Sequence, residues 1–271
     1  MNLLAAILLG ILQGLTEFLP ISSSAHLVIA QSLLPQFFIS PLLFDLFLHL
    51  GTLAAVTFFL RREVVQLLFC LAPYNLRKMD YNKRKEGQKI IVAIIEATFV
   101  TGLIGFTLKS KVEKLFSSPA IASALLLVTG ILLWMASRIK KNERREKDLN
   151  ALDSFLIGLA QGIAVLPGIS RSGATISMGI FRGLEREAAA RFSFLLSIPA
   201  ILGAFMLEAR AISPPSLGEI EILGGGFLAA AVTGFLSLRF LFWIIKKGSL
   251  NLFAYYCFLV GSAFLFLSLR V

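Results

Sequence analysis

The sequence has too few charged residues to coat a soluble protein of its length. Only 15% of the 271 residues are charged, whereas 57% are apolar, and the mean hydropathy is +0.82. Several apolar runs are long enough to cross a hydrocarbon layer ~30 Å thick, which takes roughly 20 helical residues. The composition excludes an ordinary soluble fold and predicts a single membrane domain over residues 1–271.

Cysteine is scarce as well, and the N-terminus has no basic region ahead of its first apolar run. Cys70 and Cys257 lie in apolar stretches outside any CxxC motif, which argues against a disulfide or a thiolate metal site. We expect no cleavable signal peptide. The net charge of +10 does not indicate nucleic-acid binding, because the basic residues sit in short loops between apolar runs. There they act as orientation signals and can contact anionic membrane lipids.

Six apolar runs are predicted to cross the membrane. Pro199 is expected to kink one of them without ending it. A shorter segment, residues 64–72, is predicted to lie at the membrane surface. The six runs cover about residues 38–60, 90–108, 117–137, 192–209, 222–245 and 252–269.

Two further apolar segments are interrupted halfway. Residues 3–34 are broken by Pro-Ile-Ser-Ser-Ser at 20–24, and residues 153–182 by Pro-Gly-Ile-Ser-Arg-Ser-Gly at 167–173. Each half-segment rises only roughly 15–22 Å as a helix, which is too short to cross. We therefore predict an all-α polytopic membrane protein with six full transmembrane helices and two re-entrant helix-turn-helix segments.

The two halves of the chain carry signs of an inverted-topology repeat. Three spans after each broken segment would make the halves, about residues 1–137 and 151–271, enter the membrane in opposite senses. If loops 61–89 and 138–147 are cytoplasmic, nineteen Lys and Arg residues fall inside and five outside. Inverted-repeat membrane proteins place their sites at such paired breaks. A shift of 148 residues superposes Gln13-Gly14 on Gln161-Gly162, and Ile21, Ser22 and Ser24 on Ile169, Ser170 and Ser172.

The first break carries an acid, hydroxyl groups and an imidazole. Gln13 and Glu17 are four residues apart and share one helix face. Ser22 and Ser23 follow at the break, and His26 comes one turn later. A carboxylate at membrane depth costs at least ~2.5 kcal/mol, which favours a functional role for Glu17. The alternative is a carboxyl that bonds to the serines and only holds the break closed.

The second break is suited to holding an anion. Residues 170–175 read Ser-Arg-Ser-Gly-Ala-Thr, and small residues there free backbone N–H groups at a helix N-terminus. The guanidinium fork of Arg171 suits phosphate oxygens. Inside a membrane, this combination indicates an anion with an apolar tail. The alternative is an Arg171 that pairs with Glu17 only to hold the two halves together.

The strings QGLTEFLPISSSAH (13–26) and LPGISRSGAT (166–175) together resemble the two signatures of the undecaprenyl-diphosphate phosphatase family, which is associated with bacitracin resistance. The resemblance extends over essentially the whole chain, including FDLFLHLGTLAAV (44–56). It implies a multi-pass enzyme of the bacterial inner or plasma membrane that converts a polyprenyl diphosphate lipid, undecaprenyl diphosphate, to the monophosphate. It also implies a divalent cation and an active site on the extracytoplasmic side.

Carried onto this sequence, the family's (Glu/Gln)xxxGlu pair falls on Gln13 and Glu17. The resemblance leaves the nucleophile open between His26, Ser23 and water, and we lean toward His26. A divalent cation, Mg²⁺ or Ca²⁺, would be held by Glu17, with Gln13 or Asp45 as the further candidate ligand. The predicted catalytic residues are Glu17, Ser23, His26 and Arg171. The predicted substrate-binding residues are Gln13, Ser22, Ser170, Ser172, Gly173 and Thr175.

Other polar residues in the apolar runs permit two interpretations. Asp45 and His49 lie four apart and could support the metal ligands from behind, complete the metal site or satisfy each other as packing. Glu96 is expected to pair within the bundle, with Arg239 as the candidate partner. The rival function is a polyprenyl-phosphate flippase, since inverted repeats with broken helices are typical of alternating-access carriers. The sequence leaves open whether the chain forms a homo-oligomer.

Overall fold

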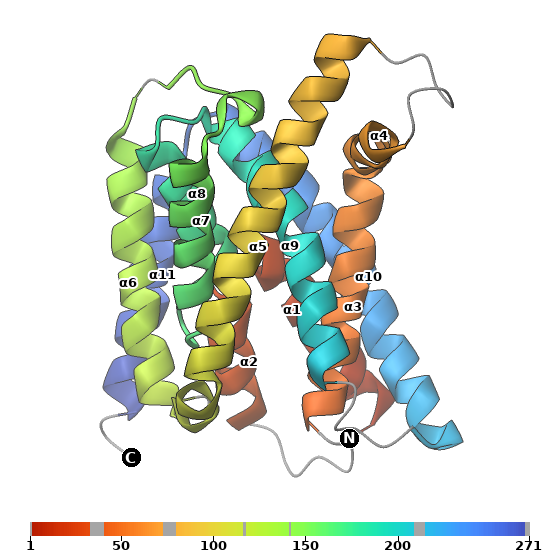
Figure 1. Cartoon of the computed structure of the whole chain (residues 1–271). Helices are drawn as coiled ribbons and strands as arrows, with labels where there is room; N and C mark the ends of the chain where they lie inside the picture. Colours follow the sequence, from red (N-terminus) through yellow and green to blue (C-terminus); the bar gives the residue numbers. More distant parts are fainter. Residues whose placement is uncertain are drawn as a thin grey trace.

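The computed structural model describes residues 2–32, 41–72, 80–115, 118–140, 142–208 and 215–268, which form a helical bundle (Figure 1). The elements are α1 (Leu3–Phe18), α2 (Ser23–Ser32), α3 (Pro41–Phe59), α4 (Arg61–Leu71), α5 (Tyr81–Leu115), α6 (Pro119–Arg138), the 3-10 turn η2 (Glu146–Asp148), α7 (Ala151–Ile163), α8 (Arg171–Phe181), α9 (Arg186–Glu208), α10 (Leu217–Lys246) and α11 (Asn251–Ser268).

Six of these helices are long and apolar enough to cross a membrane, and they are the six predicted spans: α3, α5, α6, α9, α10 and α11. The prediction of an all-α polytopic protein is therefore confirmed. α9 continues through Pro199, as expected. α5 begins at Tyr81, well before its apolar run, because Lys, Arg and Glu are also good helix formers outside the hydrocarbon layer. The predicted span ends at 38–40, 117, 209 and 269 lie outside the described residues.

Both predicted helix breaks are present. α1 ends at Phe18 and α2 begins at Ser23, while α7 ends at Ile163 and α8 begins at Arg171. Leu19 adopts an extended conformation because it precedes a proline, which disfavours helical geometry in the residue before it. The breaks convert each segment into two short helices joined by a turn.

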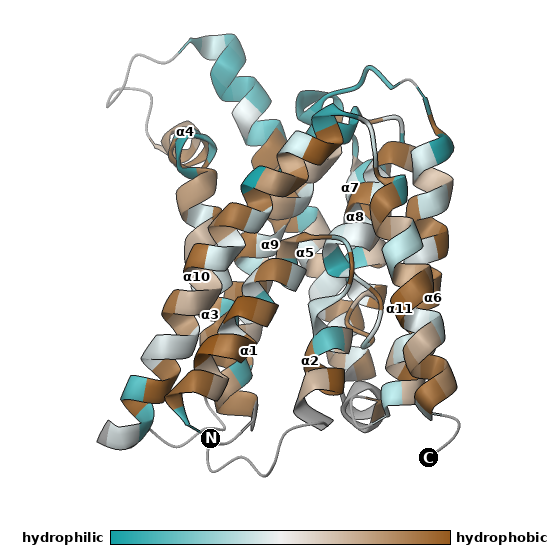
Figure 2. Ribbon diagram, turned by 180° about the vertical axis from the view of Figure 1, so that it is seen from behind, coloured by the Kyte–Doolittle hydropathy of each residue, from teal (hydrophilic) through white to brown (hydrophobic). Residues whose placement is uncertain are grey.

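In each broken segment, the second helix returns toward the end of the bundle at which the first helix begins. Figures 1 and 2 show α1 and α2 opening at one end of the bundle, and α7 and α8 opening at the other. At the open end of the second pair, Arg182 Nε on the residue after α8 donates to Asp153 on α7 at 2.7 Å. Arg144 Nη2 donates to the same buried carboxylate at 2.5 Å. We call the pairs α1–α2 and α7–α8 the two hairpins; their re-entry into a membrane stays a prediction.

Each hairpin packs its first arm on a long helix of the other half through a pair of glycines. Gly10 and Gly14 face α10, and a Cβ at Gly14 would lie 2.6 Å from the Ala230 carbonyl oxygen. Gly158 and Gly162 face α5, and a Cβ at Gly158 would lie 2.6 Å from the carbonyl oxygen of Ala97. Small residues four apart let helix backbones approach this closely inside a membrane. The two pairs are 148 residues apart, as a duplication would produce; the repeat itself stays a prediction.

The Gly14→Ala variant is expected to lower the thermal stability of the protein in detergent. The added methyl would collide with Thr233 Oγ1 and with the α10 backbone, and overpacking of this kind costs about 1–3 kcal/mol. Gly102→Ala, also in a helix, is the matched control, because among the described residues its new Cβ would have no contact within 4 Å beyond its own helix backbone. Equal melting temperatures for the two variants would contradict the close packing of α1 on α10.

The helix α4 and the hydrophilic end of the bundle relate to the predicted surface segment. α4 (Arg61–Leu71) contains all but the last residue of the predicted surface segment 64–72 and exposes Leu68 and Leu71; its placement at a membrane surface stays a prediction. Figure 2 shows hydrophilic residues gathered at the bundle end that carries α4 and the α6–α7 connection.

The predicted pair of Glu96 and Arg239 is wrong: within the described residues Glu96 lines a pocket with Lys85 and Lys89, and Arg239 is exposed on α10.

Candidate active site

The turns of the two hairpins bring an acid and an arginine together inside the bundle. Arg171 Nη2 donates to Glu17 Oε1 at 2.5 Å across 154 residues of sequence. The Glu17 side chain is only 5% exposed, and that of Arg171 is 20% exposed. The acid alone would be costly at this depth, and the guanidinium compensates its charge. The pairing predicted as an alternative for Arg171 is thus present, and it places both groups in one site.

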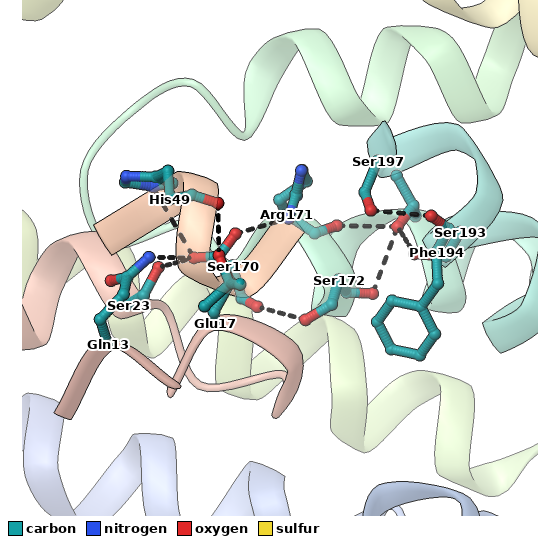
Figure 3. A network of polar contacts seen from close by, with 12 residues as sticks. Gln13, Glu17, Ser23, His49, Ser170, Arg171, Ser172, Ser193, Phe194 and Ser197 are labelled. Atoms are coloured by element: carbon teal, nitrogen blue, oxygen red, sulfur yellow. Dashed lines mark hydrogen bonds and ion pairs between the residues drawn. The ribbon is translucent and has the colours of Figure 1, made fainter. Parts of the chain in front are cut away.

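Three further groups gather around the second oxygen of Glu17 (Figure 3). Gln13 Nε2 donates to Oε2 at 2.9 Å from the preceding turn of α1. Ser23 Oγ, the first residue of α2, donates to the same oxygen at 2.6 Å. His49 Nε2 on α3 lies 3.8 Å from it. The carboxylate is therefore the common partner of groups from α1, α2, α3 and α8.

The backbone of the first turn directs Ser23 toward Glu17. Ser22 has φ of +66°, a left-handed conformation that is unfavourable for a residue with a Cβ. Its side chain accepts from the Ala25 N–H and contacts Ser24 Oγ at 3.1 Å, so it caps α2. Such strained residues concentrate at functional turns. The predicted role of Ser22 in substrate binding is untested, and its observed contacts are those of a cap.

The second turn is held by a hydroxyl from α6. Gly168 has φ of +103°, and a Cβ there would collide with the Ala122 carbonyl oxygen. Thr129 Oγ1 donates to the Gly168 carbonyl and accepts from the Ser170 N–H, both at 2.9 Å. Ser170 Oγ then caps α8 by accepting from the Gly173 N–H at 3.1 Å. These bonds fix the position from which Arg171 reaches Glu17.

The two turns also contact one another directly. The Gly168 N–H donates to Ser24 Oγ at 3.4 Å, and Ser172 Oγ donates to the Leu19 carbonyl at 3.4 Å. Thr175 Oγ1 shares a hydrogen bond with Ser193 Oγ on α9 at 2.5 Å. Both Ser172 and Thr175 are buried. Their side chains are engaged in holding α8 in place, so their predicted contact with substrate remains a prediction.

His26 lies one turn beyond Ser23 but its ring is held by other partners. Nδ1 contacts the Ser22 carbonyl at 2.8 Å and must be the donor, because a carbonyl only accepts. Nε2 therefore accepts from the Tyr256 hydroxyl at 2.8 Å, and the two rings stack. Sequence spacing gave no sign of Tyr256, which comes from α11 at the far end of the chain.

The structure also changes the interpretation of Asp45 and His49. His49 Nδ1 bonds to the backbone carbonyl of Asp45 at 2.7 Å, not to its carboxylate, and the ring faces Glu17. Within the described residues, no group of three or more His, Cys, Asp or Glu side chains converges as a metal site. Asp45 therefore does not join Glu17 and His49 in such a cluster. His49 lies at the site, although the sequence analysis paired it with Asp45 and gave it no catalytic role.

The residues around Glu17 do fit a divalent cation that also binds the substrate. Because a carboxylate only accepts, Gln13 must turn its NH₂ group toward Glu17. Its Oε1 is then left buried without a hydrogen-bond partner among the described residues. An amide oxygen beside a carboxylate is a suitable pair of ligands for Mg²⁺ or Ca²⁺. Mg²⁺ usually takes one or two carboxylates plus substrate phosphates, so a diphosphate would supply the remaining ligands.

Comparisons with known proteins identify the family of this chain. The family model described as "Bacitracin resistance protein BacA" matches residues 6–263. A Treponema denticola protein named undecaprenyl-diphosphatase is 45% identical over 262 residues, covering 96% of each chain. Proteins of the same name from Methanobrevibacter smithii and Desulfatibacillum aliphaticivorans are 42% and 41% identical, covering 96% and 98% of each chain.

Proposed function

This chain belongs to the bacitracin resistance protein BacA family, and from that premise we propose how it removes the terminal phosphate of undecaprenyl diphosphate. It is a multi-pass membrane hydrolase that releases phosphate and the lipid monophosphate. The reaction recycles the carrier lipid of cell-wall synthesis and confers bacitracin resistance. The observation that carries the proposed chemistry is the convergence of Arg171, Ser23 and Gln13 on the Glu17 carboxylate.

Arg171 is the phosphate-binding group in this mechanism. Its contact with Glu17 engages Nη2, and a guanidinium carries five N–H donors in a planar fork. The remaining donors can grip oxygens of the terminal phosphate and stabilise the charge that spreads over them during transfer. Backbone N–H groups at the start of α8 add to the positive potential there. Arg171 therefore acts mainly by electrostatic stabilisation of the transition state.

Ser23 is the nucleophile that the geometry favours. The sequence left His26, Ser23 and water as candidates, and of the two side chains only Ser23 bonds to Glu17 among the described contacts. Glu17 accepts the hydroxyl proton while Oγ attacks the terminal phosphorus. The bond from that phosphorus to the bridging oxygen breaks, and undecaprenyl monophosphate leaves with the electron pair. Water then cleaves the phosphoserine and releases phosphate. His26 supports the turn that presents Ser23.

A divalent cation would be held by Glu17 and Gln13 together with the diphosphate. When bound, it would neutralise phosphate charge and polarise the phosphoryl group. In support, Gln13 Oε1 is buried without a hydrogen-bond partner, and a hard cation satisfies such an oxygen. The proposed site opens on the extracytoplasmic side of the bacterial cell membrane. The hydrophilic α6–α7 connection and α4 lie at one end of the bundle, whereas the α1–α2 hairpin opens at the other (Figure 2).

The purified protein in detergent is expected to release phosphate from a short-chain prenyl diphosphate in the presence of Mg²⁺. A hydrolase needs no sealed membrane, whereas the rival flippase yields no product under these conditions. Two hairpins that open at opposite ends of the bundle are compatible with a carrier, so phosphate release is needed to distinguish the hydrolase from the flippase. Absence of phosphate release from folded protein would overturn the hydrolase.

Chelation is expected to stop phosphate release, and added Mg²⁺ is expected to restore it. The Gln13→Leu variant removes the amide oxygen with little change in volume. It should raise the Mg²⁺ concentration for half-maximal activity by at least about tenfold, a typical loss for groups that tune a metal site. Titration of activity against Mg²⁺ in both proteins measures this. Identical titration curves would remove Gln13 from the cation site.

A further inference from the structure

The orientation of the His49 ring defines which of its nitrogens carries the proton. Nδ1 lies 2.7 Å from the Asp45 backbone carbonyl, which can only accept, so Nδ1 is the donor. In the neutral ring Nε2 therefore presents a lone pair. This is the nitrogen that faces Glu17 Oε2, at 3.8 Å. A backbone carbonyl that fixes the ring in this way is a common means of holding an imidazole ready for chemistry.

Nε2 of His49 and Oε2 of Glu17 are two acceptors that face each other. At 3.8 Å they cannot share a direct hydrogen bond, but one water molecule can donate to both. The His49 side chain is 36% exposed, whereas that of Glu17 is 5% exposed. His49 is therefore the side of the pair that water can reach. Ser23 Oγ lies on the same carboxylate oxygen, so a water held there would sit beside the proposed nucleophile.

The proposed reaction requires a second proton acceptor. Glu17 takes the Ser23 proton in the first step and still holds it when water attacks the phosphoserine. Gln13, the neighbouring group, is an amide and cannot accept a proton under these conditions. His26 has both ring nitrogens engaged, by Ser22 and Tyr256. In the part of the chain that the structure describes, His49 is the remaining side chain near Glu17 whose ring nitrogen can accept a proton.

We propose that His49 is the general base that activates water for hydrolysis of the phosphoserine. This inference rests on the proposed function. Water loses a proton to Nε2 and its oxygen bonds to phosphorus, while the bond from phosphorus to Ser23 Oγ breaks. Oγ recovers the proton held by Glu17, and phosphate departs. His49 then gives its proton to the departing phosphate or to solvent. In this chain, whose first motif has an amide at residue 13, the imidazole of α3 supplies the missing base.

The test follows the phosphoenzyme with a short-chain prenyl diphosphate labelled on its terminal phosphate. In the His49→Ala variant, we expect a rapid burst of labelled phosphoserine as in the parent protein. Turnover should then fall by about 10²–10³-fold, the usual contribution of a general base. Free imidazole in solution should raise the turnover of His49→Ala at least tenfold. A carboxylate introduced by the second substitution Gln13→Glu should do the same. His49→Gln provides a second variant that can hold water but cannot accept its proton, and it should accumulate phosphoserine too. Ala54→Leu, an exposed position on the same helix, is the control and should behave as the parent.

The outcomes separate this inference from the function on which it rests. Normal turnover of folded His49→Ala or His49→Gln overturns the role of His49 while the serine mechanism stands. Loss of the burst itself places His49 earlier in the reaction and also overturns it. Accumulated phosphoserine that neither imidazole nor Gln13→Glu relieves shows a structural role only. Phosphate release without labelled serine in the parent protein removes the serine mechanism, and this inference with it.

Discussion

Replacing Arg171 by alanine is expected to lower kcat/KM for prenyl diphosphate hydrolysis by about 10³-fold or more. Loss of a single preorganised donor to a developing anion costs about 10²–10³-fold, and the guanidinium supplies more than one. Arg171→Lys keeps the charge but loses the planar fork, so we expect an intermediate loss. Phosphate release at several substrate concentrations gives kcat and KM for each variant.

The same substitution leaves Glu17 buried without its partner, so stability must be separated from catalysis. Removing one partner of a buried ion pair costs about 3–5 kcal/mol when the other remains charged. The double variant Glu17→Gln, Arg171→Ala removes both charges. It should regain thermal stability and stay inactive. An Arg171→Ala protein that folds and retains its kcat/KM would contradict the assignment of Arg171 to phosphate binding.

Replacing Ser23 by alanine should abolish the phosphoenzyme and reduce turnover by more than about 10⁴-fold, the scale of loss when a covalent nucleophile is removed. The intermediate can be identified by its chemistry, since phosphoserine survives acid and is cleaved by base, whereas phosphohistidine behaves in the opposite way. Ser24→Ala is the matched control. Ser24 contacts Ser22 and the Gly168 N–H, and it has no contact with Glu17 among its described bonds.

We expect Ser24→Ala to keep its activity within a few-fold of the parent protein. An acid-labile, base-stable phosphate that disappears in His26→Ala would transfer the nucleophile to His26. Full activity of folded Ser23→Ala would leave water as the attacking group, with Glu17 as its base. These results distinguish the three candidate nucleophiles that the sequence left open: Ser23, His26 and water.

The positions of the spans and of both helix breaks were predictable because they depend on local chemistry. Proline at residue 20 restricts Leu19 to an extended conformation, and Gly168 adopts a φ that other residues avoid. The pairing of Glu17 with Arg171 was also predictable, since each charge is costly at membrane depth without the other. Gly10 and Gly158 continue the same 148-residue register, a signal that the sequence contained.

The remaining contacts depend on packing between helices far apart in the chain. The spacing of Asp45 and His49 shows only that they share a helix face, and the ring bonds to a backbone carbonyl that every helical residue possesses. Its approach to Glu17 follows from the way α3 lies against α1. In the same way, Tyr256 reaches His26 from the last helix. No local pattern specifies such meetings.

The origin of the catalytic pair in opposite halves of the chain has a consequence for biosynthesis. While the ribosome is still making the second half, Glu17 has already been synthesised but the guanidinium that pairs with it does not yet exist. An uncompensated acid at that depth costs at least ~2.5 kcal/mol, so the early chain is expected to remain loosely inserted, with this residue protonated or near the headgroups. Completion of α8 supplies Arg171, and we expect the N-terminal hairpin to take its final place only then. A nascent or truncated copy that ends before Arg171 therefore lacks the proposed phosphate-binding group and is expected to be inactive.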